Sequence, residues 1–269
     1  MNTYIVGLDA SGKSTALAAL WFSVVDRSEW CEWFLPNSDR PSDTSYWAEL
    51  RDRWLRGESL DITVSAFKLE VLKLRLSKKG KFFGLKKLNI LIPDIAGEDF
   101  QKIYELGRFP KKHTELLTKS DHIVLFVRSD MNDHPILLMA PNKMTQVECS
   151  ENKGFEWHPR EAHPSCKLIA ILKGIRRLRD NDMPRITVAL SAWDLVQDNL
   201  SPREVIKINL PLLYQYLQTN FVFDVVGVSA QGFDYDKGLQ LKDGIELDDI
   251  KRIIVVDNEI HHDITRVFA

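Results

Sequence analysis

Residues 7–15 read Gly7-Leu8-Asp9-Ala10-Ser11-Gly12-Lys13-Ser14-Thr15 and match the phosphate-binding pattern G-x-x-x-x-G-K-[ST]. The apolar run Tyr4-Ile5-Val6 before them predicts a short buried strand, and the run from Ala16 to Val25 after them predicts a helix. Gly7 lets the backbone turn sharply where the strand ends. The helix then presents unpaired N–H groups and the positive end of its dipole to an anion. The stretch therefore predicts a strand, a loop and a helix that hold the phosphates of a nucleotide.

The residues of this loop have distinct expected roles. Backbone N–H groups of residues 8–12 wrap a β-phosphate, Lys13 reaches the β- and γ-phosphates, and the Ser14 hydroxyl ligates Mg²⁺. The loop residues that we expect to contact the nucleotide are Asp9, Ala10, Ser11, Gly12, Lys13, Ser14 and Thr15.

Length and composition narrow the class of protein. The chain has 269 residues, 44% of them hydrophobic, and a formal net charge of −2, so we expect no general nucleic-acid surface. Three scattered cysteines favour a reducing compartment, and we expect no leader peptide, because the first expected strand begins almost at Met1. No apolar run is long enough to span a membrane. We predict a cytoplasmic protein with one domain over residues 1–269 and irregular insertions at about 26–62 and 129–164.

The order of expected elements predicts the fold class. Strand-like runs at 67–76 and 86–93 flank a turn at 78–81, which predicts an antiparallel hairpin. Further strands at 123–127, 185–190 and 222–228 alternate with helical segments at 98–119, 167–179 and 202–219. The first of these helical segments is expected to be interrupted near Gly107 and Pro110. This alternation predicts an α/β fold, a P-loop NTPase three-layer sandwich whose sheet is mostly parallel with one antiparallel hairpin.

Shorter elements are expected in the first insertion and near residue 269. Residues 47–56 predict a helix with Ser45 as its cap. Residues 245–256 fit a helix or a strand, and Asp263 is placed to cap a short last helix.

Polar residues follow three of the expected strands. Asp94 and Gly97 follow the second hairpin strand, Ser191 to Asp194 follow the strand at 185–190, and Ser229-Ala230 follow the strand at 222–228. In open α/β sheets, ligands bind at the carboxyl ends of the strands. We expect Asp94 to hold Mg²⁺ through a water and the Gly97 N–H to contact a γ-phosphate.

These motifs together carry a family resemblance. The loop, the D-x-x-G of residues 94–97, the x-x-x-D ending at Asp194 and the S-A-x of residues 229–231 resemble translation-factor-related GTPases of the Ras-like superfamily in order and spacing. The loop is similar to that of Arf GTPases. The D-x-x-G-E-D-F wording and the large insertions look like prokaryotic GTPases of paired, conflict-system contexts. The resemblance covers most of residues 4–232.

The resemblance implies a guanine site that binds GTP or GDP with Mg²⁺. Asp194 would read guanine N1–H and the N2 amine, and the Ala230 N–H would meet guanine O6. Ser191 stands where the family usually has Asn or Thr. Ala192 stands where the family has a lysine that covers the base, and Trp193 is the candidate to cover it instead.

The resemblance also implies the residues of hydrolysis. The family's hydrolytic Gln is Glu98 here, next to Gly97, and Thr63 fits the switch threonine that binds Mg²⁺, with Thr44 as the runner-up. The catalytic candidates are therefore Gly97, Glu98 and Thr63, and the metal candidates are Ser14, Thr63 and Asp94. Candidate arginine fingers are Arg51, Arg53 and Arg56. A carboxylate beside the γ-phosphate predicts slow turnover.

Three functions stay open at this point. The first is a Mg²⁺-dependent GTP-binding switch with slow GTP hydrolysis, which acts on an unidentified effector or responds to an activating protein. The second is a P-loop ATPase or phosphotransferase. The third is a non-hydrolysing module that keeps its nucleotide as a structural support.

Overall fold

A computed structural model describes residues 1–60, 71–79, 84–93, 97–132, 162–179, 182–196, 200–232 and 249–269. Within them, an eight-stranded sheet runs in the order β2-β3-β1-β4-β5-β6-β7-β8. The strands are β1 (Asn2–Gly7), β2 (Val71–Lys79), β3 (Leu85–Pro93), β4 (His122–Arg128), β5 (Arg185–Ser191), β6 (Phe223–Ser229), β7 (Ile254–Val256) and β8 (Ile260–His261). The helices are α1 (Lys13–Asp26), α2 (Ser45–Arg56), α3 (Gly97–Leu106), α4 (Lys111–Thr118), α5 (Pro164–Arg179), α6 (Pro202–Asn209) and α7 (Pro211–Asn220).

The sheet confirms the predicted fold class. β1 pairs in parallel with β3 and β4, and β4, β5 and β6 continue the parallel order. β2 and β3 form the predicted antiparallel hairpin, from Val71↔Pro93 to Lys79↔Leu85. The turn predicted at 78–81 is wrong at its start, because Lys78 and Lys79 still pair with β3. Beyond the prediction, β7 pairs antiparallel with β6, and β8 pairs antiparallel with β7. The parallel strands therefore all point their carboxyl ends to one edge of the sheet, where β1 delivers the phosphate loop.

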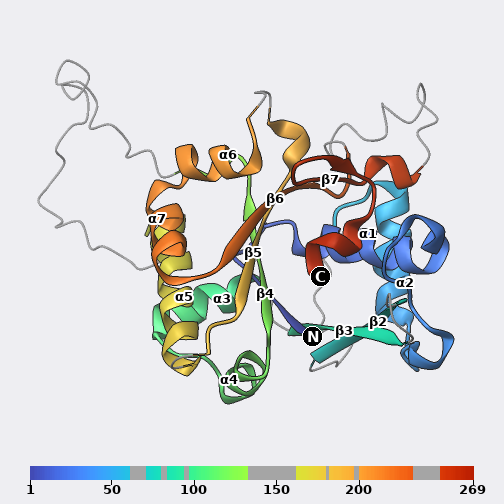
Figure 1. Cartoon of the computed structure of the whole chain (residues 1–269), viewed down its shortest axis with the longest axis horizontal. Coiled ribbons are helices and arrows are strands. Elements are labelled where there is room, and N and C mark those ends of the chain that lie inside the picture. The colour runs from blue at the N-terminus through green and yellow to red at the C-terminus, as the bar shows by residue number, and fades with distance from the viewer. Residues whose placement is uncertain are drawn as a thin grey trace, which may run out of the picture.

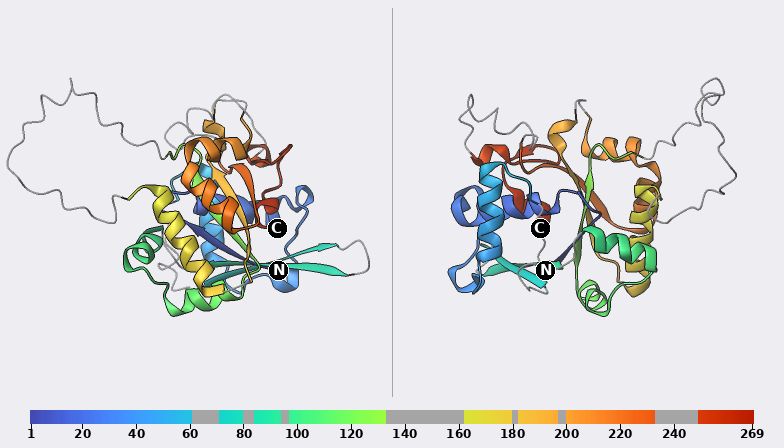
Figure 2. Two further views of the ribbon diagram at one scale, coloured as in Figure 1. Left: turned by 60° about the vertical axis from the view of Figure 1, so that its left-hand side comes forward. Right: turned by 180° about the vertical axis from the view of Figure 1, so that it is seen from behind.

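Helices cover both faces of the sheet (Figures 1 and 2). α1 and α2 lie on one face, and α3, α5, α6 and α7 lie on the other. β4 shows why the layers form, because its side chains alternate between the two cores. Val124 and Phe126 pack with the α1 side, whereas Ile123, Leu125 and Val127 pack with the α5 side.

The first expected insertion, at about 26–62, contains α2, which packs against α1. Trp47 of α2 stacks on Trp21 of α1 with ring centroids 5.0 Å apart, and Trp54 lies 5.0 Å from Phe22. Both tryptophans of α2 are fully buried. The aromatic side chains of the insertion therefore form core on the α1 face. The predicted Ser45 cap is wrong, because Ser45 is the first helical residue and its N–H donates to Asp43 Oδ1 at 2.9 Å.

The expected helix at 202–219 is two helices. α6 ends at Asn209 and α7 begins at Pro211, because proline has no N–H to continue the ladder of α6. The expected segment at 98–119 likewise divides into α3 and α4 around Gly107 and Pro110, as predicted.

Residues 249–269 return to the α1 face of the sheet. They contain the short 3₁₀ helices η7 (Asp249–Arg252) and η8 (Ile264–Phe268), with β7 and β8 between them. Asp263 caps η8 as predicted, since its carboxylate accepts from the Thr265 N–H at 2.9 Å. Phe268 is fully buried beside Phe126 of β4, with ring centroids 6.2 Å apart. Residues near both numbered ends of the chain therefore share one core.

A buried histidine ties this segment to the sheet. Thr3 of β1 donates its hydroxyl proton to the Phe268 carbonyl at 2.9 Å, so its oxygen accepts from His122 Nδ1 at 3.2 Å. His122 Nε2 is then unprotonated and accepts from the Thr187 hydroxyl at 2.8 Å. Burial, and next the charge of Arg185, lower the pKa of His122 to about 4. The ring is therefore neutral and fixed in one tautomer.

No helix of the described residues is both long and apolar enough to cross a bilayer.

Candidate functional site

The phosphate loop connects the end of β1 to the start of α1. Gly12 takes a left-handed conformation with φ +83° directly before Lys13, the first residue of α1. Gly7 ends β1, and a Cβ there would lie 2.6 Å from the Ser11 hydroxyl and 2.9 Å from the Phe126 carbonyl oxygen. A side chain at either position would force the loop open. The glycines of the motif therefore allow the tight turn that the sequence predicted.

Lys13 lies folded into the loop. Its ammonium donates to the carbonyl oxygens of Gly7 at 2.8 Å and Leu8 at 2.6 Å, and to the Ser11 hydroxyl at 3.0 Å. These three bonds use all three ammonium donors. Burial lowers the pKa of Lys13 to about 8, against the opposing charge of Asp9. A phosphate that enters the loop therefore replaces loop carbonyls as the partner of this cation.

The loop packs directly against the expected base motif. A Cβ at Gly12 would lie 2.7 Å from the Cβ of Ser191, which ends β5. The Ser191 carbonyl accepts from the Ser129 N–H at 3.0 Å, which ties it to the end of β4. The structure thus brings residues 12 and 191 into contact, as a single nucleotide site requires.

Asp194 is oriented by a second strand end. The Ser229 hydroxyl at the end of β6 donates to Asp194 Oδ1 at 2.7 Å and accepts from the Gly232 N–H at 3.2 Å. One carboxylate oxygen of Asp194 is thereby held, and the other keeps acceptor capacity for a ligand. The predicted contact of Ser229 with a ligand stays a prediction, and its hydroxyl holds the Asp194 carboxylate in place.

Two residues that the sequence did not predict, Trp54 and Arg252, bind the carbonyls of Ala230 and Gln231. The Ala230 carbonyl accepts from the buried Trp54 indole at 2.8 Å. The carbonyl of Gln231 accepts from Arg252 Nε at 3.2 Å, and Arg252 Nη2 also donates to the Trp54 carbonyl at 3.1 Å. The tryptophan-rich insertion was a signal for Trp54, but no sequence pattern marks Arg252.

Ala192 and Trp193 connect Ser191 to Asp194. Ala192 has φ +54°, which is uncommon for a residue other than glycine. Its carbonyl accepts from the Ser129 hydroxyl at 2.8 Å. Trp193 begins the 3₁₀ helix η6 (Trp193–Leu195), and its ring lies directly on Gly227 of β6, where a Cβ would be 2.3 Å from the indole. The indole therefore packs on one side against the sheet and stays partly exposed, and its role in covering a base stays a prediction.

The residues expected at the γ-phosphate are only partly described. Thr63 and Asp94 lie outside the described residues, as does the D-x-x-G stretch before Gly97. Gly97 and Glu98 are the first two residues of α3. Ser14, the remaining metal candidate, is the second residue of α1, and Thr15 follows it. Among the described residues, Ser14 at the start of α1 is the metal candidate whose hydroxyl could bind Mg²⁺. The roles of Gly97, Glu98 and Thr63 in hydrolysis stay predictions.

The candidate arginine fingers and the runner-up threonine all lie on or beside α2. Thr44 precedes the first residue of α2. The three arginines bind carboxylates: Arg51 pairs with Asp26 and Asp52, Arg53 with Glu49, and Arg56 with Glu58. Each would have to leave its carboxylate to reach a phosphate.

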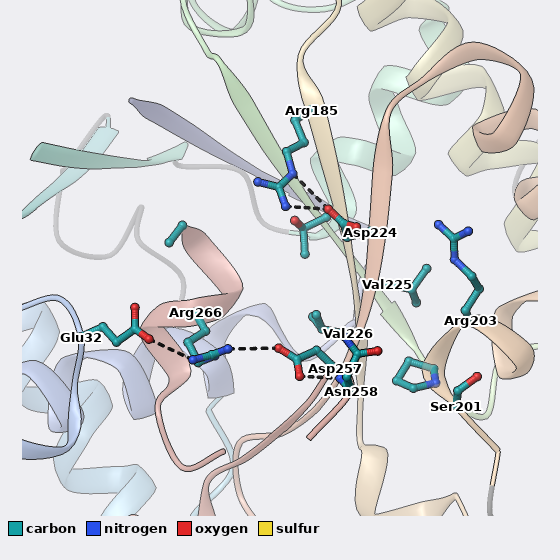
Figure 3. Close-up of a pocket in the computed structure, with 13 residues that line it drawn as sticks. Glu32, Arg185, Ser201, Arg203, Asp224, Val225, Val226, Asp257, Asn258 and Arg266 are labelled. Atoms are coloured by element: carbon teal, nitrogen blue, oxygen red, sulfur yellow. Dashed lines mark hydrogen bonds and ion pairs between the residues drawn. The ribbon is translucent and has the colours of Figure 1, made fainter. Parts of the chain in front are cut away.

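A pocket of about 580 Å³ lies at the opposite edge of the sheet, where β5 and β6 begin (Figure 3). Two of its three arginines form ion pairs, whereas Arg203 donates to the Phe223 carbonyl. Arg185 binds Asp224 at 2.6 Å, and Arg266 binds Glu32 at 2.9 Å and Asp257 at 3.3 Å. The pocket contains none of the motif residues and is separate from the phosphate loop.

Comparison with known proteins now identifies the family. The family model of Double-GTPase 1 matches residues 4–269. The chain belongs to the Double-GTPase 1 family. The match covers the phosphate loop, the base motifs and residues 249–269, so this Double-GTPase 1 chain is a P-loop protein of a GTPase family.

The chain was also compared with curated proteins and with solved structures. None of the curated proteins matches the sequence. Among solved structures, the chain is similar to one described as the signal recognition particle receptor SRb-GTP/SRX complex from Chaetomium thermophilum. The identity is 12%, the TM-score is 0.41, and the match covers 87% of this chain and 92% of the other.

Proposed function

We propose that this Double-GTPase 1 protein is a Mg²⁺-dependent switch that binds GTP and GDP, prefers guanine over other bases and hydrolyses GTP slowly. The observation that supports the base preference is the hydrogen bond from Ser229 to Asp194, beside a loop that packs on Ser191. A carboxylate with one oxygen held and one available accepts guanine N1–H or N2–H, whereas adenine N1 has no hydrogen to donate.

The phosphate part of the site has its own support. Lys13 is already inside the loop, and the glycines at positions 7 and 12 leave space that a side chain would fill. Mg²⁺ bound at Ser14 would neutralise charge between the β- and γ-phosphates. We propose that Asp94 and Thr63 complete this metal site.

Slow hydrolysis is supported by chemistry at two positions. Glu98 puts a carboxylate where related enzymes have a neutral amide, and the arginines of α2 are bound to carboxylates. We propose a turnover on the order of 10⁻⁴ s⁻¹ without a partner, as for unassisted small GTPases. A purified turnover above about 1 s⁻¹ would show that the chain has a complete catalytic set.

The experiment that tests the base preference uses the Asp194→Asn variant. Each charge-assisted hydrogen bond to guanine contributes about 1.5–3 kcal/mol, so wild type should prefer GTP over ATP by at least about tenfold. The variant presents an N–H donor, which suits the extra carbonyl of xanthine. We therefore expect Asp194→Asn to lose GTP affinity and gain XTP affinity in competition against a fluorescent GTP analogue.

The result that would overturn the proposal is equal binding of ATP and GTP by wild type. An ATPase or phosphotransferase would then explain the phosphate loop better. The switch itself is tested by limited proteolysis of the GDP form and of the form with a non-hydrolysable GTP analogue. Identical protection in the two forms would mean that the nucleotide is a structural support.

A further inference from the structure

The base loop, residues 229–232, is braced by two residues that are distant in sequence. Trp54 lies near the end of α2, and Arg252 ends η7. Both side chains are buried, with 0% and 4% of their surface exposed. The Arg252 guanidinium stacks on the Trp54 ring at 4.3 Å from its centroid, so the two side chains form one unit.

This unit binds successive carbonyls of the loop. Trp54 Nε1 donates to the Ala230 carbonyl at 2.8 Å, and Arg252 Nε donates to the Gln231 carbonyl at 3.2 Å. The loop also passes close to the backbone of Arg252, because a Cβ at Gly232 would lie 2.9 Å from the Arg252 carbonyl oxygen. The back of the loop therefore has no room to shift toward η7.

Peptide geometry carries this constraint to the front of the loop. In a trans peptide, the N–H points opposite to the C=O of the preceding residue. The Gln231 carbonyl faces Arg252, and the next N–H, that of Gly232, faces the opposite way and donates to the Ser229 hydroxyl. The same geometry directs the Gln231 N–H away from Trp54. Ser229 in turn holds Asp194 at 2.7 Å.

We infer that Trp54 and Arg252 are positioning residues that set the base preference of the site from behind the base loop. They fix the two peptide planes on either side of Gln231. Through the Gly232 N–H and the Ser229 hydroxyl, these planes hold the Asp194 carboxylate, which faces the base in the proposed function. The inference rests on the proposed guanine preference.

The experiment compares GDP, ADP and inorganic pyrophosphate as ligands of wild type, Trp54→Phe and Arg252→Lys. Trp54→Phe keeps an aromatic ring against Phe22 but removes the indole donor, and Arg252→Lys keeps the charge but loses the two-point contact. Loss of one hydrogen bond should lower the preference for GDP over ADP by about three- to tenfold in each variant. Pyrophosphate affinity, which reports the phosphate loop alone, should stay within twofold of wild type.

The matched control is Trp47→Phe. Trp47 lies on the same helix and is buried like Trp54, but it stacks on Trp21 of α1. The control should leave the preference for GDP over ADP unchanged. Thermal unfolding of all variants with pyrophosphate present shows whether each one is folded.

Three results would overturn the inference, and each is distinct from failure of the proposed function. An unchanged preference in both variants would do so, as would an equal loss in Trp47→Phe. Loss of pyrophosphate affinity in parallel with GDP affinity would show a general structural role. In all three cases wild type still prefers GDP. If wild type itself does not prefer GDP over ADP, the proposed guanine preference is wrong, and the inference that rests on it is wrong too.

Discussion

Lys13 sets the pH dependence expected for nucleotide binding. Its pKa is about 8 in the free protein, because the ammonium is buried among loop carbonyls. A bound phosphate raises this pKa, so binding takes up a proton when the pH is above about 8. The affinity for GDP should therefore be constant below pH 8 and fall by up to about tenfold per pH unit above it. Calorimetry of GDP binding at pH 7.5–9.5, in two buffers of different ionisation enthalpy, measures both the affinity and the proton uptake.

A flat affinity profile with no proton uptake would contradict this role for Lys13. Lys13→Arg is the control, because its guanidinium stays charged across the same range and should remove the pH dependence whatever its affinity.

Most residues of the candidate site could be predicted from sequence motifs. Gly12, Lys13, Ser191, Asp194 and Ser229 were all identified from their motifs, and the structure brings them together at one sheet edge. Motifs identify such residues because phosphate and base chemistry restricts which residue types can occupy them. Trp54 was missed because its hydrogen bond to Ala230 joins residues 176 positions apart. Any buried tryptophan satisfies the local pattern, so only the fold reveals its partner.

The 3₁₀ helix η6 and strand β6 meet through Trp193 and Gly227, and this contact fixes the approach of Asp194. A methyl group in Gly227→Ala would lie 2.3 Å from the indole, so η6 must shift. We expect a loss of about 1–3 kcal/mol in the free energy of unfolding, typical of overpacking. We also expect a loss of guanine preference larger than any loss of pyrophosphate affinity. Denaturant unfolding and competition binding measure the two effects.

The double variant Gly227→Ala with Trp193→Leu is the control for η6. The smaller side chain makes room for the new methyl group and should recover part of the lost stability. If Gly227→Ala leaves both stability and base preference unchanged, the contact does not position Asp194.

Elements were predicted well where the local signal was strong. The β2–β3 hairpin follows from its turn, and the cap of η8 follows from Asp263. The division at Pro211 was missed because the apolar periodicity continues from α6 into α7, although proline cannot donate the N–H that one continuous helix needs. β7 and β8 were not resolved from sequence because strands of three and two residues are too short to show a period.

Across the whole molecule, His122 links β1, β4, β5 and residue 268. Its pKa of about 4 in the folded protein lies below the value near 6.5 of an unfolded chain, so the unfolded chain binds more protons between these values. Stability should therefore fall as the pH is lowered from 6.5 to 4, by up to about 3 kcal/mol from this group. Urea unfolding at a series of pH values measures the loss.

Carboxylates also titrate near pH 4, so His122→Gln provides the reference. The difference in unfolding free energy between wild type and His122→Gln should change with pH in this window and be constant above it. A constant difference throughout would mean that the histidine is not the source.

The packing of residues 249–269 against β1 has a consequence for the order of events during synthesis. The phosphate loop, α1 and β1 leave the ribosome before Arg252 and Phe268, which brace the base loop and complete the core beside β1. A nascent chain therefore has a phosphate loop before Trp54 and Arg252 together can hold residues 229–232. Under the proposed guanine preference, we therefore expect selectivity for the base to appear only after residues 249–269 have docked, in a folding step that follows formation of the phosphate loop.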